Sequence, residues 1–516
     1  MNRRKLFRIT GAGLASAAWG SVRAALAPQA RPPNLLFLLV DQQRLDTLRV
    51  YGNRKIIAPN LNRLADQSIA FSRYYVSQPV CTPSRGCLLT GLYPHTHGSI
   101  NNNIPLNSSL PVLVEMFQNK DYATAYFGKW HLGDELCPQH GFQEFETIED
   151  GYTRPGEKTC ARDYSGYFRF LASQGLKPDS KKGFYTRDFA NQVPKELSKP
   201  AYLAMQATQF LERHQRQPWV LYVSSLDPHD PFHSVNDHLY NPADLGVPKS
   251  FSQDPDATEL ERTKTVRAEQ MRNPHGPLAT AGNLQEVKAR YWGKITLVDE
   301  MYGRILAKLE ALGLADNTLI VFTTDHGEMM GDHRLMFKSV MYEEAANVPL
   351  LLRIPWLQGK SQRIDKPVAQ VDLVPTLLEL MGQPVPRHLQ GFSWAPFLLE
   401  GRELPDRNVM LEWNGQPQSG QSIDPERLRT IITPEGWKMN MGREGAGELF
   451  HLNDDPREMV NLFYREESLR VIRLLTAEVN LWQRSTGDAI LPFDEQAWTQ
   501  WRKKYGTHAT ANGLLD

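Results

Sequence analysis

Residues 34–42 read NLLFLLVDQ, a mostly apolar run over residues 34–40 that ends in two polar side chains, Asp41 and Gln42. An uninterrupted apolar run of this length is typical of a strand buried on both faces of a parallel sheet. Similar runs cover residues 122–127, 219–224, 318–323 and 348–354. Amphipathic stretches, which predict helices, lie between the runs at residues 60–70, 110–119, 202–214, 286–312 and 372–381. This alternation predicts an α/β fold in which helices flank a large, mostly parallel sheet.

Four of the apolar runs lead directly into polar or charged residues. After the first run, these are Gly128-Lys129-Trp130-His131, Leu226-Asp227-Pro228-His229 and Thr324-Asp325-His326-Gly327. In open α/β sheets, ligands bind beyond the carboxyl ends of the strands. We therefore expect the four strand exits to contribute to one shared site.

Two long segments and a C-terminal region depart from this rhythm. Residues 133–200 and 228–284 are polar and rich in Pro, Gly and Lys, and we interpret them as excursions around the mouth of the site that set substrate choice. Short strands are expected at residues 409–413, 428–433, 437–441 and 448–451, followed by a helix over 467–483. The sequence therefore predicts a catalytic α/β domain over residues 31–404 and a smaller α+β subdomain, built on an antiparallel sheet, over 405–516.

Composition narrows the class of protein. The 516 residues contain 58 Lys and Arg and 58 Asp and Glu, so the formal net charge is zero, which argues against a nucleic-acid binder. Hydrophobic residues make up 41% of the chain, as in an ordinary globular protein. Four cysteines are too few for a disulfide scaffold. No strongly apolar stretch approaches the length of a membrane-spanning helix, so we expect no stable membrane insertion.

The N-terminal residues 1–30 have the pattern of an export signal. A basic start that includes Arg3-Arg4 precedes a weakly apolar run rich in Ala and Gly, and small residues follow at 24–27. The adjacent arginines resemble a twin-arginine signal, which implies the twin-arginine export machinery as a partner. We therefore expect a periplasmic or secreted protein.

Cys81 stands out among the four cysteines because of its neighbours. Residues 81–86 read CTPSRG, and Pro83 suits the first turn of a helix. Cys81 would then lie at a helix N-terminus, which stabilises an anion, with the positive charge of Arg85 close by. The other three cysteines lack such a context, and we interpret them as buried bystanders: Cys87, Cys137 and Cys160.

Residues 81–86, with Leu89-Thr90-Gly91 after them, resemble the signature of the sulfatase family. The resemblance covers most of the chain and is carried by an ordered set of motifs. They are Asp41-Gln42, Gly128-Lys129-Trp130-His131, His229 in PHDPF, Asp325-His326-Gly327-Glu328, Lys338, Glu448-Leu449-Phe450 and Asp455-Pro456-Arg457-Glu458 with Asn461-Leu462. It implies an alkaline phosphatase-like fold and a sulfuric ester hydrolase.

The resemblance also implies a cofactor chemistry. In sulfatases the signature cysteine is oxidised to formylglycine, so Cys81 would be the substrate of a formylglycine-generating or sulfatase-maturating enzyme. One hydroxyl of the hydrated aldehyde attacks sulfur, and the second expels sulfate afterwards. The metal ligands carried over are Asp41, Gln42, Asp325 and His326, with modified residue 81 as a further contact. Carboxylate and amide oxygens favour Ca²⁺ or Mg²⁺, and the imidazole makes Mn²⁺ an alternative.

The remaining candidates are cations and histidines. Lys129, Lys338 and Arg85 are expected to surround the charged oxygens of the substrate. By resemblance, His229 protonates the leaving alcohol and His131 handles the formylglycine hydroxyl. His333 is a candidate for supporting these residues, and substrate contacts are expected, more weakly, from Asp230, Glu343 and Glu344.

Two other functions remain open at this point. Phosphonate monoester and phosphodiester hydrolases on the same scaffold resemble this chain, including its Asp-Gln and Asp-His pairs. A non-catalytic anion-binding protein would retain an unmodified Cys81. The substrate is expected to be a sulfate ester of a carbohydrate or an aryl alcohol, and no motif in the long excursions identifies it.

Overall fold

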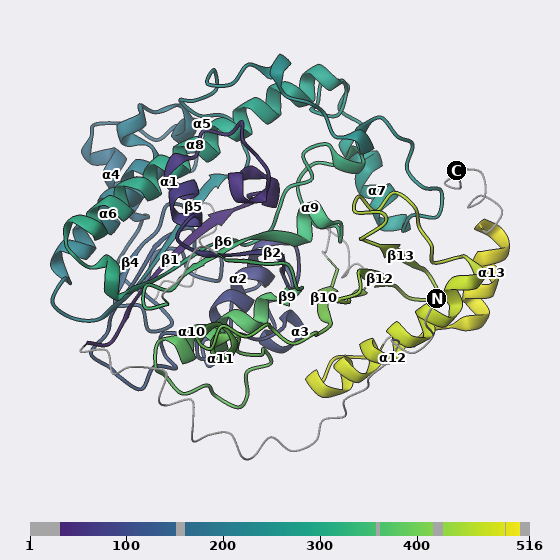
Figure 1. Cartoon of the computed structure of the whole chain (residues 1–516). Helices are drawn as coiled ribbons and strands as arrows, with labels where there is room; N and C mark the ends of the chain where they lie inside the picture. Colours follow the sequence, from purple (N-terminus) through teal and green to yellow (C-terminus); the bar gives the residue numbers. More distant parts are fainter. Residues whose placement is uncertain (1–30, 151–159, 358–361, 416–426, 491, 506–516) are drawn as a thin grey trace.

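The computed structural model describes residues 31–150, 160–357, 362–415, 427–490 and 492–505. The proposed signal at residues 1–30 lies outside them. A nine-stranded sheet and a four-stranded sheet organise this part of the chain (Figure 1). The strands of the large sheet are β1 (Asn34–Asp41), β2 (Ile69–Tyr75), β3 (Ala123–Gly128), β4 (Glu144–Glu146), β5 (Trp219–Pro228), β6 (Thr318–Thr324), β7 (Asn347–Arg353), β8 (Gln362–Ile364) and β9 (Val368–Ala369).

The large sheet has the order β4-β3-β5-β1-β6-β7-β2-β8, and β9 also pairs with β2. The first five strands of this order run parallel, as predicted from the apolar runs. β7 is antiparallel to both β6 and β2, so the run at 348–354 is a strand but lies in the reverse direction. The sheet is therefore mostly parallel, and its parallel strands end on the same edge.

Helices cover both faces of the large sheet because the side chains of β1 alternate between two cores. Leu36, Leu38 and Val40 pack with α1 (Pro59–Ala65), α6 (Lys199–Arg213) and α8 (Ala281–Ala311). Leu35, Phe37 and Leu39 pack on the other face, toward α2 (Cys81–Thr90), α10 (Leu373–Leu380) and α11 (Ala395–Leu399). Figure 1 shows these two groups of helices on opposite sides of the sheet. No helix among the described residues is long and apolar enough to cross a membrane.

The C-terminal region forms the predicted antiparallel sheet. Its strands are β10 (Val409–Trp413), β11 (Leu428–Ile432), β12 (Trp437–Met441) and β13 (Gly447–His451), joined in sequence order. Two helices, α12 (Leu469–Thr486) and α13 (Glu495–Tyr505), follow the sheet. The predicted helix at 467–483 corresponds to α12, whereas α13 was not predicted.

Several expectations about local structure were wrong. Residues 110–119 form turns instead of a helix, because the amide of Leu113 donates to Leu89 O and that of Val112 donates to the Glu115 side chain. The stretch at 60–70 contains α1 and the start of β2, which pairs with distant strands. The excursions are not plain loops, since they contain α4 (Gly166–Ser173), α5 (Arg187–Gln192) and α7 (Glu261–Gln270). Two further short helices are α3 (Pro94–His97) and α9 (Glu343–Ala346).

The cysteines also require a correction. Cys137 and Cys160 form a disulfide within the first excursion, so they are not inert bystanders. Nothing in the local sequence marks this pair, because the two cysteines are 23 residues apart and come close together only after the chain folds. Cys81 and Cys87 are free and buried, both in α2.

Candidate active site

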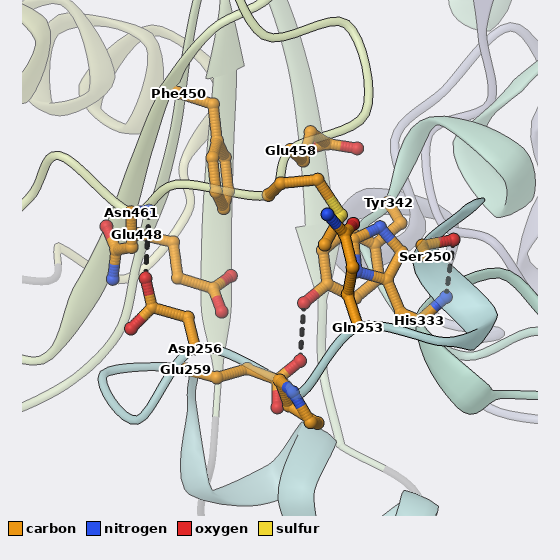
Figure 2. Close-up of a pocket in the computed structure, with 12 residues that line it drawn as sticks. Ser250, Gln253, Asp256, Glu259, His333, Tyr342, Glu448, Phe450, Glu458 and Asn461 are labelled. Atoms are coloured by element: carbon orange, nitrogen blue, oxygen red, sulfur yellow. Dashed lines mark hydrogen bonds between the residues drawn. The ribbon is translucent and has the colours of Figure 1, made fainter. Parts of the chain in front are cut away.

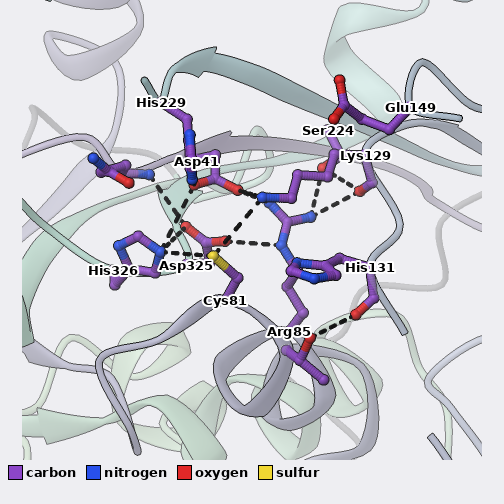
Figure 3. Close-up of polar contacts among 12 residues, drawn as sticks. Asp41, Cys81, Arg85, Lys129, His131, Glu149, Ser224, His229, Asp325 and His326 are labelled. Atoms are coloured by element: carbon purple, nitrogen blue, oxygen red, sulfur yellow. Dashed lines mark hydrogen bonds and ion pairs between the residues drawn. The ribbon is translucent and has the colours of Figure 1, made fainter. Parts of the chain in front are cut away.

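The strand exits meet at one edge of the large sheet, as predicted. Asp41 ends β1, Lys129 follows β3, His229 follows β5, and Asp325 and His326 follow β6. The first residue of α2, Cys81, points into this group, and Figure 3 shows it between His326 on one side and Lys129 on the other. All six side chains are buried. Chemistry-bearing residues that are up to 285 positions apart in sequence therefore share one small volume.

Four of these residues form a group with the geometry of a metal site. Ligand atoms of Asp41, Cys81, Asp325 and His326 all lie within 4.8 Å of one another. Asp41 Oδ1 is a buried acceptor that receives no hydrogen bond, and such an atom is costly unless a cation or donor satisfies it. Two carboxylates, an imidazole and a sulfur position thus fit a divalent cation.

His326 and Gln42 are both held in place by hydrogen bonds to neighbouring groups. His326 Nδ1 donates to the carbonyl of Gly327 at 2.9 Å, which directs Nε2 toward Cys81 Sγ at 3.1 Å. Gln42 Nε2 donates to Glu328 Oε2 at 2.6 Å, and the amide oxygen of Gln42 accepts from Lys338 Nζ. Glu328 is in turn held by the backbone amides of Met330 and Phe337. This arrangement is typical of metal ligands, whose second polar atom is fixed by a carbonyl or carboxylate.

Arg85 contacts the carboxylates from within the protein. Its Nε donates to Asp325 Oδ2 at 2.8 Å and its Nη2 to Asp41 Oδ2 at 2.9 Å, while Nη1 donates to Lys129 O and Ser224 Oγ. The side chain is 1% exposed. Burial alone would lower the pKa of Arg85, but Asp325 and Asp41 raise it well above its ordinary value. Arg85 therefore fixes the orientation of the two carboxylates.

Lys129 bridges Asp41 and Cys81. Its Nζ lies 2.6 Å from Asp41 Oδ2 and 3.8 Å from Cys81 Sγ. Burial alone would raise the pKa of Asp41, but the charges of Lys129 and Arg85 hold it well below its ordinary value. Burial and Asp41 raise the pKa of the Cys81 thiol, yet Lys129, Lys338 and His326 together lower it. The pocket thus stabilises negative charge at residue 81.

Lys338 and His229 lie together at the open side of the pocket. Lys338 Nζ donates to His229 Nε2 at 2.9 Å and also to Gln42 Oε1. His229 Nδ1 donates to Asp230 O at 2.8 Å, and because its Nε2 accepts from the Lys338 ammonium group, this arrangement fits a neutral imidazole. Burial and the charge of Lys338 hold the pKa of His229 well below its ordinary value. Lys338 is half-buried, unlike the fully buried Lys129.

His131 is placed by a loop that sequence reasoning missed. Its Nε2 lies 3.0 Å from Asn103 Oδ1, and its carbonyl accepts from Thr82 Oγ1, next to Cys81. Glu135 accepts from the backbone amide of His131 at 2.5 Å. Burial and the charge of Lys129 hold the pKa of His131 well below its ordinary value. Asn103 carried no signal, whereas Glu328 belongs to a quoted motif and Ser224 ends the predicted apolar run at 219–224.

The more weakly predicted residues divide between the site and other regions. Asp230 contacts His229, with 3.1 Å between Asp230 Oδ1 and His229 Nδ1. Glu343 instead pairs with Lys438 of the C-terminal sheet, and the neighbouring Glu344 is half-buried in α9. His333 lines a separate cavity with room for about one water molecule, among acidic side chains of the second excursion and the C-terminal sheet (Figure 2). That cavity does not contain Cys81.

A buried anion-stabilising residue lies at a helix start, beside a group that could hold a metal ion and next to Lys129 and Lys338, and this arrangement suits a hydrolase of anionic esters. Comparison with protein families identifies the particular one. The sulfatase family model matches residues 33–383, and the model for the C-terminal region of N-sulphoglucosamine sulphohydrolase matches residues 331–485. The chain belongs to the sulfatase family, of the alkaline phosphatase-like superfamily. The predicted fold and the class of enzyme, a sulfuric ester hydrolase, are thereby confirmed.

The individual relatives share only 22–28% sequence identity with this chain. The chain is 28% identical to the arylsulfatase of Clostridium perfringens, over 84% of this chain and 91% of that protein. It is 27% identical to the multifunctional alkaline phosphatase superfamily protein PehA of Trinickia caryophylli, over 89% and 96%. Among solved structures, the phosphonate monoester hydrolase SpPMH of Silicibacter pomeroyi matches with a TM-score of 0.71 at 22% identity, covering 89% of this chain and 96% of that one. BT4656, solved with its substrate D-glucosamine-2-N,6-O-disulfate, matches with 0.70 at 22% identity, covering 89% and 99%. These structures support the fold.

Proposed function

We propose that this enzyme cleaves its sulfate ester through a formylglycine formed from Cys81, with a divalent cation bound beside it. The observation that carries the proposal is the convergence of Cys81 with Asp41, Asp325 and His326 within 4.8 Å. The ends of β1 and β6 and the start of α2 build this convergence from three separate parts of the chain. A sulfate ester bound here would lie near the nucleophile position, the cation pocket and the basic side chains of Lys129, Lys338 and Arg85.

The cation would be held by Asp41, Gln42, Asp325 and His326, and by residue 81. Three of the protein ligands supply oxygen, so we propose Ca²⁺, with Mg²⁺ and Mn²⁺ as alternatives. When bound, the cation would act as a Lewis acid on a sulfate oxygen and would lower the pKa of the attacking hydroxyl. Arg85 would serve this site by holding both carboxylates in place.

Residue 81 would be the nucleophile after oxidation by a formylglycine-generating or sulfatase-maturating enzyme. An aldehyde hydrate supplies one hydroxyl for attack and a second for release, which an unmodified thiol does not. Lys129, which lies 3.8 Å from Cys81 Sγ, would stabilise the oxygen that develops negative charge. His131, fixed by Asn103 and Glu135, would exchange the proton of the second hydroxyl.

His229 and Lys338 would serve the leaving group. His229 is neutral beside Lys338, and an arriving sulfate monoanion would raise the pKa of the imidazole by its negative charge. The protonated His229 would then deliver its proton to the leaving alcohol oxygen. Lys338 would contact a sulfate oxygen from the open side.

The substrate class that we propose is a sulfated carbohydrate or an aryl sulfate. The arylsulfatase of Clostridium perfringens and the ulvan-active sulfatase of Formosa agariphila are both 28% identical to this chain. The N-acetylglucosamine-6-O-sulfatase of Bacteroides thetaiotaomicron is 25% identical. The two excursions, which carry α4, α5 and α7, are the segments that we propose for substrate choice.

Mass spectrometry of the peptide that contains residue 81 tests the nucleophile directly. We expect formylglycine in the mature protein, and loss of aryl sulfate turnover in Cys81→Ala. Cys87→Ala is the matched control, since Cys87 lies in the same helix, is equally buried and has a pKa that burial raises well above its ordinary value. An unmodified thiol, together with full activity in Cys81→Ala, would refute the formylglycine mechanism. An unmodified thiol in a protein that turns over no ester would favour an anion-binding protein.

A phosphonate monoester or phosphodiester hydrolase is the second candidate. It is favoured by the Asp-Gln and Asp-His pairs at residues 41–42 and 325–326 and by the likeness to SpPMH. Sulfate and phosphate esters share a tetrahedral shape, so turnover of matched aryl sulfate, aryl phosphodiester and aryl phosphonate substrates discriminates between them. A clear preference for either phosphorus ester would reverse the order of the two candidates.

We also propose that the protein is exported to an oxidising compartment through a twin-arginine signal at residues 1–30. The Cys137–Cys160 disulfide supports this, because disulfides persist mainly outside the cytosol. Fusion of residues 1–30 to a reporter, with Arg3→Lys and Arg4→Lys as the matched variant, tests the route. We expect export to fail only in the variant.

A further inference from the structure

The loop that carries Lys338 has an unusual backbone. Phe337 and Ser339, which flank Lys338, have φ values of 68° and 75°. Residues other than glycine rarely adopt this left-handed conformation, because Cβ then crowds the backbone. The loop therefore depends on outside contacts to keep Lys338 beside His229 and Gln42.

Two contacts from distant segments hold Ser339. Its amide donates to Pro79 O at 3.0 Å, two residues before Cys81. Its carbonyl accepts from Nη1 of Arg262, in the first turn of α7. Ser339, which follows Lys338, is thus hydrogen-bonded through its amide to the segment before Cys81 and through its carbonyl to the second excursion.

Arg262 is itself fixed by the C-terminal sheet. Its guanidinium carbon lies 3.7 Å from the ring centroid of Trp413, the last residue of β10. Trp413 is fully buried, and its core also contains Val80 and Met341. A planar guanidinium stacks on an indole ring, whereas an ammonium group does not reproduce the stack and the directed hydrogen bond together.

The C-terminal sheet also holds the segment before Cys81. Glu412 N donates to Ser77 O at 2.8 Å, and Asn414 Nδ2 donates to Gln78 Oε1 at 3.0 Å. The residues on both sides of Trp413 therefore contact the segment that leads to the nucleophile, while Trp413 contacts Arg262. The end of β10 therefore sets the distance between residue 81 and Lys338.

We infer that Arg262 is a positioning residue of the active site, held by Trp413, which places Lys338 for leaving-group departure. The inference rests on the proposed function, since Lys338 and His229 must act on the leaving group. Arg262 acts through the peptide of Ser339. The C-terminal sheet therefore contributes to catalysis through the stacked pair of Arg262 and Trp413.

Leaving-group dependence distinguishes this role from a merely structural one. Phenyl sulfate releases a phenol with a pKa of about 10 and requires assistance, whereas 4-nitrophenyl sulfate releases a more acidic phenol. For Arg262→Lys we expect kcat to fall by about 10- to 100-fold on phenyl sulfate, because small misplacements have effects of this size. On 4-nitrophenyl sulfate we expect a loss of less than about threefold, since that leaving group needs less help.

Two comparisons control the experiment. Trp413→Phe keeps an aromatic face for Arg262 and is expected to retain the wild-type ratio of the two rates, whereas Trp413→Leu is expected to shift it as Arg262→Lys does. Arg402→Lys is the matched control, because Arg402 stacks on Phe397 at 4.6 Å in a different part of the chain. Thermal melting reports the folded fraction of each variant.

The outcomes separate the inference from the proposed function. Equal fold losses on both substrates in Arg262→Lys and Trp413→Leu, or no loss, overturn the positioning role while the wild-type enzyme remains an active sulfatase. A wild-type protein that carries formylglycine and hydrolyses neither aryl sulfate overturns the proposed function, and the inference with it. A selective loss on phenyl sulfate in either variant supports the positioning role.

Discussion

Glu149 is expected to be one of the most consequential ionic residues outside the candidate site. Figure 3 draws it at the edge of the view, past Lys129 and Ser224. It joins the starts of two helices, since it accepts from Lys199 Nζ in α6 and from Arg187 Nε in α5 at 2.7 Å. Its side chain and that of Lys199 are each 6% exposed. Replacement by glutamine in Glu149→Gln keeps the shape but leaves two cations without their counter-charge.

The expected magnitude follows from the pKa of Glu149. Burial alone would raise this pKa, but Lys199 and Arg187 lower it from 4.5 to about 2. A depression of this size corresponds to about 3 kcal/mol of folding stability at pH 7. Because the folded-state pKa is lowered, the contribution is present above pH 4.5 and is lost as the pH falls through about 2. Removing one partner of a buried pair has an effect of similar size, about 3–5 kcal/mol.

Urea unfolding followed by tryptophan fluorescence measures this effect. At pH 7 we expect Glu149→Gln to lose about 3 kcal/mol relative to wild type, and at pH 3 about half of that. Adding Lys199→Met to Glu149→Gln should restore part of the loss, because it removes the uncompensated buried ammonium group. Glu144→Gln is the control, since its pair with Arg213 is partly exposed and should contribute at most about 1 kcal/mol. Equal losses in Glu149→Gln and Glu144→Gln at pH 7 would refute the reasoning.

Three further predictions concern other parts of the molecule. Burial lowers the pKa of His95, but Glu412 raises it above 6.5. Wild type should therefore be more stable than His95→Gln, with the full difference below pH 6.5 and a smaller one as the pH rises. A difference in unfolding free energy that grows at alkaline pH, measured by urea titration, would contradict this. Replacing both Cys137 and Cys160 by serine opens a closure of 23 residues and should lower stability by about 3 kcal/mol, as measured by urea unfolding, unless the folded state relaxes to compensate fully. A chelator should abolish turnover and lower the melting temperature of wild type, and added Ca²⁺ should restore both. In Asp41→Asn the Ca²⁺-dependent rise in melting temperature should disappear. If that rise persists, Asp41 is not a ligand of the cation.

The parallel part of the sheet could be predicted because its strands are buried on both faces. Residues 35–40, for example, are all apolar, so neither side of this strand suits contact with solvent. β2 could not be separated from the helix before it, since its identity as a strand depends on pairing with β7, nearly 280 residues away. The direction of β7 was also beyond local reasoning, because an apolar run reads the same for parallel and antiparallel strands.

The candidate site was predictable to the extent that its residues follow strands. Asp41, Lys129, His229 and Asp325 are placed by the parallel sheet, so their convergence follows from the topology. Asn103 lies in a loop between α3 and β3, and its contact with His131 depends on a positive φ of 65° that no flanking pattern indicates. Residues that support a site from a loop therefore need the folded chain for their identification.

Lys338 shows why only part of the site can be predicted from residues that follow strands. It follows no strand directly, and its position depends on a left-handed loop that three distant segments hold in place. The segment before Cys81 and the second excursion contact the neighbouring peptide, and the C-terminal sheet fixes the excursion through Trp413. Asp41, Asp325 and His326, which we propose as ligands of the cation, thus follow strands of the sheet. Lys338, which we propose to face the leaving group, is held by segments outside the sheet, and so we expect substitutions in those segments to change substrate preference while the proposed cation pocket stays intact.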